Sequence, residues 1–98
     1  MYTTAGILKP YVEKDKIPLV VPVCTMDIAE PAGWLFCATC PPSYEIDTLL
    51  TWISEEHWDY DKGVPQIGFV GWSEPYSVEQ ERAMREYCQA HPDKFQWA

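Results

Sequence analysis

The chain has 98 residues and a formal net charge of −8 at pH 7. This length suits one domain of about 100 residues and excludes a doubly wound dinucleotide-binding fold, a (β/α)8 barrel and a protein kinase. No apolar run approaches the roughly 18 residues of a membrane span, and the first residues do not have the layout of a signal peptide. We therefore expect one soluble, cytoplasmic domain spanning residues 1–98.

Prolines and glycines divide the first forty residues into short elements. Residues 1–16 form an ambiguous, irregular N-terminal segment, because Pro10 would interrupt a helix there. The β-branched residues of Ile17–Cys24 predict a strand, and its two prolines suggest an edge or a bulge. Residues 27–33 read as a turn, and residues 34–39 as a second strand that pairs with the first in a hairpin.

A helix is predicted from Ser43, which can act as its N-cap, to about Trp58. At 100° per residue its apolar face carries Ile46, Leu49, Leu50 and Ile53. Residues 64–70 predict a third strand. Ser77 and Gln80 have the spacing of a capping box, which begins a second helix that ends near His91 and buries Ala83, Met84, Tyr87 and Cys88.

These elements predict an α+β fold with the order β-β-α-β-α. We expect a small two-layer domain in which a three-stranded sheet carries both helices on one face.

The negative charge is concentrated in the middle of the chain. Between Ile17 and Asp61 there is no Lys or Arg, but there are eight acidic residues. Residues 1–16 carry a net charge of +1 and residues 62–98 a net charge of −1. Such a field repels nucleic acid and anionic membranes, so we expect neither as a direct partner and favour a basic protein surface instead.

Large aromatic side chains accompany these carboxylates. Trp and Tyr are enriched as anchors at protein interfaces, and carboxylates pair with Arg and Lys. In the first predicted helix, Trp52 precedes Glu55, Glu56 and Asp59 at spacings of i+3, i+4 and i+7. The alternative is that these Trp side chains complete a small core. The candidate partner-binding residues are Asp47, Trp52, Glu55, Glu56, Trp58, Asp59, Asp61, Trp72 and Glu74.

The sequence has no nucleophile elbow and no Gly-rich phosphate loop, so we expect no enzymatic activity. No motif identifies a family. In size, charge and lack of catalytic motifs the chain resembles nuclease-immunity proteins, DNA mimics and phage anti-defence proteins, including anti-CRISPR proteins. The resemblance implies an inhibitor that occupies the basic surface of a nucleic-acid-binding or nuclease protein.

Four cysteines and two histidines leave other interpretations open. A zinc-stabilised adaptor would use the Cys3His set Cys37, Cys40, Cys88 and His91, because both pairs have a two-residue spacing. Cys24, Cys37, Cys40 and His57 form an alternative quartet. The motif Cys37-Ala-Thr-Cys40 is also similar to that of thioredoxin-like oxidoreductases, but only 24 residues separate Cys40 from Pro65, which leaves no room for the β-α unit of that family. We expect no resident cofactor other than a structural zinc ion, if the Cys3His set forms.

Overall fold

The computed structural model describes the backbone of residues 2–98 and the side chains of residues 4–98. The chain divides into two compact units, one ending at Pro42 and the other comprising Ser43–Ala98. We call them the N-terminal and the C-terminal unit. The expectation of a single domain stays a prediction. Among the described residues, no helix is both long and apolar enough to cross a membrane.

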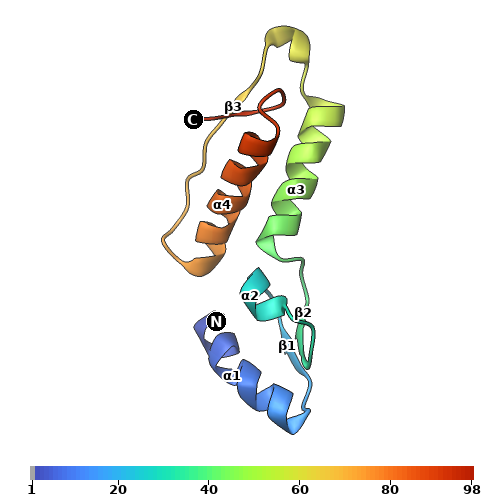
Figure 1. The fold of residues 1–98 in the computed structure, drawn as a ribbon, viewed down its shortest axis with the longest axis vertical. Coiled ribbons are helices and arrows are strands. Elements are labelled where there is room, and N and C mark those ends of the chain that lie inside the picture. Colours follow the sequence, from blue (N-terminus) through green and yellow to red (C-terminus); the bar gives the residue numbers. More distant parts are fainter. Residues whose placement is uncertain (1) are drawn as a thin grey trace. The chain divides into compact units, whose positions relative to one another are not determined.

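The N-terminal unit contains α1 (Tyr2–Asp15), β1 (Leu19–Val21), α2 (Met26–Ala29) and β2 (Leu35–Cys37) (Figure 1). The predicted strands are therefore present, but they are parallel and not a hairpin, with Leu19 opposite Leu35 and Val21 opposite Cys37. Parallel strands need a crossover connection, and residues 22–34 supply it with α2 in the place of the predicted turn. The core of this unit consists of Ala5, Val21, Cys24, Ile28 and Leu35.

The expectation of an irregular N-terminal segment is wrong, because α1 continues through Pro10. Three side chains on one face of α1, at i, i+4 and i+8, bind it to the rest of the unit. Ala5 is buried in the core, Lys9 Nζ donates to the carbonyl of Ile28 at 2.8 Å, and the Glu13 carboxylate accepts the backbone N–H of Trp34 at 2.7 Å. These tertiary contacts offset the helix hydrogen bond that proline removes.

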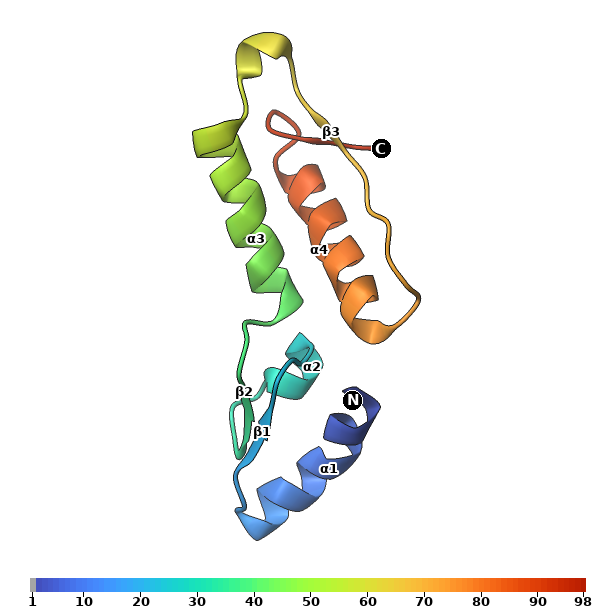
Figure 2. The ribbon, with the colours of Figure 1, turned by 180° about the vertical axis from the view of Figure 1, so that it is seen from behind.

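The C-terminal unit is built on two helices, α3 (Pro42–Trp52) and α4 (Pro75–Ala90). They lie side by side and run in the same direction, joined by a long return segment (Figures 1 and 2). Side-chain hydrogen bonds join their corresponding ends: Ser43 Oγ donates to Glu79 Oε1 at 2.9 Å, and Thr51 Oγ1 lies 3.1 Å from the Tyr87 hydroxyl. The core between them consists of Ile46, Leu50, Ala83, Tyr87, Cys88 and Phe95.

The predicted three-stranded sheet is not formed. The third strand is reduced to β3 (Gln66–Ile67), which pairs in parallel with β4 (Gln96–Trp97), an element that the sequence did not predict. Pro65 and Gly68 flank β3, and both residue types weaken a strand interior. The molecule therefore has a mixed α+β fold with four short strands in two separate two-stranded parallel sheets.

Candidate functional site

Side chains of α3 and of the π-helix that follows it line a shallow hollow that is open to solvent. Trp52, which is 51% exposed, is its one aromatic lining residue. The carboxylates of Asp47, Glu55 and Glu56 have neither a hydrogen bond nor an ion pair with the described part of the chain. The residues that line the hollow are Asp47, Thr48, Thr51, Trp52, Glu55 and Glu56.

Two of these residues, Thr48 and Thr51, were not predicted from the sequence. Thr48 precedes Trp52 by four residues, and Thr51 follows Asp47 by four, so both lie on the same side of α3 as a predicted residue. This helical spacing is the signal that could have found them.

A π-helix, Ile53–His57, follows α3 directly and carries Glu55 and Glu56. Its wider turn is closed by the backbone N–H of Trp58, which donates to the carbonyl of Ile53, five residues earlier, at 2.8 Å. The Trp52 and His57 rings stack with their centroids 5.2 Å apart and their planes at 20°. In an α-helix, residues five apart point about 140° away from each other. The π turn therefore allows one face of the Trp52 indole to pack on His57.

The turn after the π-helix holds three more of the candidate residues, and two of them stabilise the turn itself. Trp58 Nε1 donates to the carbonyl of Gly63 at 2.9 Å. The Asp59 carboxylate accepts the backbone N–H of Asp61 at 3.1 Å and lies 3.7 Å from Lys62 Nζ. The Asp61 side chain is exposed. Trp58 and Asp59 thus have a structural role in the 3-10 helix Tyr60–Lys62 in addition to any role in binding.

Tyr60 connects this turn by a hydrogen bond to the segment that precedes β4. Its hydroxyl donates to the carbonyl of Lys94 at 3.0 Å. Partial burial, and to a lesser extent the neighbouring Tyr87 and Asp93, raise the pKa of Tyr60, so the hydroxyl keeps its proton and remains a donor.

The remaining two candidates, Trp72 and Glu74, lie just before α4, at the opposite end of the helix pair from Trp52. The Trp72 side chain is 84% exposed. Glu74 is the N-cap of α4, and its carboxylate accepts the backbone N–H groups of Tyr76 at 3.0 Å and Ser77 at 2.7 Å. A hydrogen bond from the Ser77 side chain is the main reason why the pKa of Glu74 is lowered, and the two backbone N–H groups lower it further. The predicted capping box is therefore wrong: Ser77 lies inside the first turn and donates to the cap.

A second hollow, a groove of about 460 Å³, runs between α3 and α4. Asp47 and Thr51 line both this groove and the first hollow, so the two surfaces adjoin. Neither Lys nor Arg lines the groove. Its other lining residues are Ser43, Ala83, Glu86, Tyr87, Ala90 and His91.

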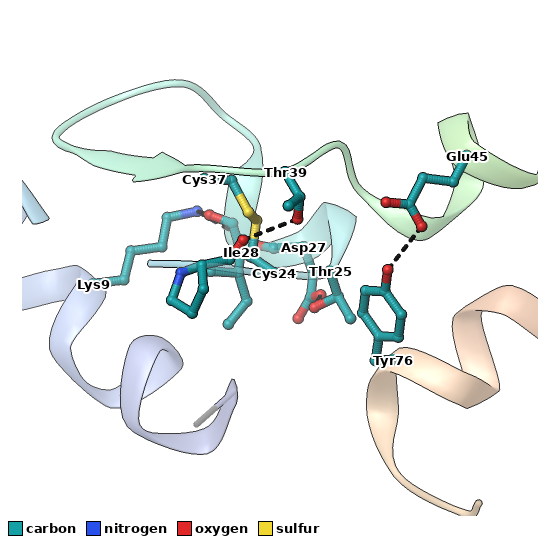
Figure 3. The surroundings of a disulfide bond; sticks show 10 residues. Lys9, Cys24, Thr25, Asp27, Ile28, Cys37, Thr39, Glu45 and Tyr76 are labelled. Atoms are coloured by element: carbon teal, nitrogen blue, oxygen red, sulfur yellow. Dashed lines mark hydrogen bonds between the residues drawn. A yellow bond between two sulfur atoms is a disulfide. The ribbon is translucent and has the colours of Figure 1, made fainter. Parts of the chain in front are cut away.

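Cys37, which both predicted zinc sets and the Cys-Ala-Thr-Cys motif include, is not a free thiol in the structure. Cys37 forms a disulfide with Cys24, with 6.1 Å between their Cα atoms (Figure 3). Cys40 is an exposed free thiol. Cys88 and His91 belong to the other unit, where Cys88 is buried and burial raises the pKa of its thiol. Within residues 2–98 no group of three or more His, Cys, Asp and Glu side chains could hold a metal ion.

No protein-family model matches the chain. Neither a curated protein nor a solved structure is significantly similar to it.

Proposed function

We propose that this protein is a small acidic inhibitor that occupies the basic surface of a nucleic-acid-binding or nuclease protein. The observation that supports this function best is the exposed Trp52 in a hollow that is also lined by the carboxylates of Asp47, Glu55 and Glu56. The sequence between Ile17 and Asp61 contains no basic residue that would neutralise them. The resemblance in size and charge to immunity proteins, DNA mimics and phage anti-defence proteins agrees with this proposal.

The inhibitor acts by replacing nucleic acid on its partner. Carboxylates of Asp47, Glu55 and Glu56 take the positions of phosphates and pair with Arg or Lys of the partner. The free face of the Trp52 indole takes the position of a base and stacks on an aromatic or guanidinium group. Because exposed charges are screened by salt, the complex weakens as the ionic strength rises.

The test begins with a tagged pull-down from candidate host lysates, washed at about 0.1 M and then about 0.5 M salt, between which the screening length falls by roughly half. A retained protein is then loaded with a labelled oligonucleotide, and displacement of the oligonucleotide by this chain is measured. We expect displacement that weakens with salt. A partner that binds no nucleic acid, or a complex that salt leaves unchanged, would refute the mimicry.

Charge-reversal variants locate the binding surface. Glu55→Lys with Glu56→Lys should abolish displacement, because it replaces two carboxylates of the hollow with positive charges that repel a basic surface. Both side chains are exposed, so the exchange buries no charge. Asp59 is left unchanged because its reversal would disrupt the turn that it caps. The matched control, Asp15→Lys with Asp93→Lys, changes the net charge equally at exposed positions elsewhere and should keep displacement. Equal loss in both double variants would show that net charge alone, and not the hollow, matters.

A further inference from the structure

Three of the four cysteines lie in the N-terminal unit and differ in exposure. Cys24 is fully buried, with 0% of its side chain accessible, and Cys37 is half-buried. Cys40 is exposed and carries a free thiol, and only two residues separate it from the disulfide-bonded Cys37. A free thiol that follows a disulfide sulfur so closely in the chain can reach it for thiol–disulfide exchange once the intervening backbone is released.

We propose that the N-terminal unit is an intramolecular thiol–disulfide exchange site in which Cys40 competes with Cys24 for Cys37. The Cys40 thiol loses its proton to solvent, and its thiolate attacks Cys37 Sγ. The Cys37–Cys40 bond forms as the Cys24–Cys37 bond breaks, and the electron pair leaves with Cys24 Sγ, which takes up a proton. One disulfide is exchanged for another, so the step needs neither an oxidant nor a reductant.

The folded unit favours the Cys24–Cys37 bond. Two hydrogen bonds hold the residues after Cys37 beside the end of β1. Ala38 N–H donates to the carbonyl of Val21 at 2.8 Å. Thr39 Oγ1 donates to the carbonyl of Pro22 at 2.9 Å, the bond drawn from Thr39 in Figure 3. A thiolate released at Cys24 would lie in the apolar core with Val21, Ile28 and Leu35, where it is poorly stabilised. Both effects oppose exchange while the unit is folded.

The unfolded chain favours the Cys37–Cys40 bond. Cys24 and Cys37 are 13 residues apart, whereas Cys40 follows Cys37 by three. The entropy of closing a loop favours the shorter one. The disulfide that the chain holds therefore reports whether the N-terminal unit is folded, and this inference is independent of the proposed function, which rests on the other unit.

The experiment maps the disulfide in the full chain. The protein is equilibrated with a glutathione redox buffer, desalted and incubated without air at about pH 8, close to the pKa of a free thiol, with or without urea. Samples are quenched with acid, free thiols are blocked, and peptides from a digest at low pH are identified by mass. We expect Cys24–Cys37 as the main disulfide in native buffer and Cys37–Cys40 as the main disulfide in urea, with reversal on dilution.

Two variants separate this route from others. Cys40→Ser changes an exposed side chain and should keep Cys24–Cys37 in urea, whereas Cys88→Ala, which removes the only other free thiol, should exchange as the wild type does. The proposal is overturned if the wild type keeps Cys24–Cys37 in urea, if Cys37–Cys40 predominates in native buffer, or if exchange requires Cys88.

Discussion

Two adjacent leucines of α3 provide a matched test of where the core of the C-terminal unit lies. The apolar periodicity of the sequence assigns both to the buried face. In the structure Leu50 is 0% exposed and belongs to the core cluster, whereas Leu49 is 44% exposed. Changing each to Ala makes the same chemical change in the same helix, so differences in helix propensity cancel and burial alone distinguishes the two variants.

The expected losses follow from burial. Removing three fully buried carbon atoms from Leu50 costs about 2.4 kcal/mol of transfer free energy, and the cavity left behind raises the total to about 3–5 kcal/mol. Leu49 is about half buried and its site opens to solvent, so Leu49→Ala should cost about 1 kcal/mol. We therefore expect the free energies of unfolding of the two variants to differ by about 2–4 kcal/mol.

Urea unfolding monitored by tryptophan fluorescence measures this difference. The signal reports mainly on the C-terminal unit, because four of the five Trp residues lie there. A unit of this size has only about 3–8 kcal/mol of stability, so Leu50→Ala can be unfolded without urea. Leu50→Val and Leu49→Val, which remove roughly one methylene group each, then give the comparison over a measurable range. Equal losses at the two positions, or a larger loss at Leu49, would refute the assignment of the core.

Other contacts predict smaller effects. Lys9 Nζ donates to the carbonyls of Ile28 and Glu30 at the end of α2. Lys9→Met should therefore lower the free energy of opening of the N-terminal unit by about 1–2 kcal/mol, measured by faster amide hydrogen exchange. The control Lys14→Met, at an exposed position of the same helix, should leave exchange unchanged. Because the pKa of Glu74 is lowered in the folded state, its carboxylate stabilises the fold at any pH above the ordinary pKa of a Glu side chain. This stabilisation is lost as the pH falls through the lowered pKa. Urea midpoints of the wild type and Glu74→Gln should accordingly differ at pH 7 and converge as the pH falls below the lowered pKa of Glu74. A double-mutant cycle of Thr51→Val and Tyr87→Phe should give a coupling free energy of about 1 kcal/mol, and a value near zero would show that their contact adds no stability.

Local patterns in the sequence correctly indicated several elements. The spacing of apolar residues identified Ile46, Leu50, Ala83 and Tyr87, which the structure places in one core. The prediction that the last helix ends near His91 is confirmed, since α4 ends at Ala90. These features depend on side chains a few residues apart on one helix, so periodicity reveals them.

Patterns of the same kind misjudged elements that distant residues decide. Pro10 indicated the end of a helix, yet contacts of Lys9 and Glu13 with residues some twenty positions later hold α1 together. Two short strands indicated a hairpin, but strand direction depends on the connecting segment, which here contains α2. The π-helix after α3 has no simple sequence signature, so the stacking of Trp52 on His57 was not foreseen.

For the candidate site, the sequence by itself determined the chemistry: an acidic segment without basic residues, interspersed with Trp. Only the tertiary structure decided which of these residues lie together. It places Asp47, Trp52, Glu55 and Glu56 around one hollow, gives Trp58 and Asp59 a role in a turn, and puts Trp72 and Glu74 at the other end of the helix pair. The reason is physical. The net charge of a segment depends only on its sequence, whereas the residues that share one surface depend on how α3 and α4 pack and on the direction in which each helix runs.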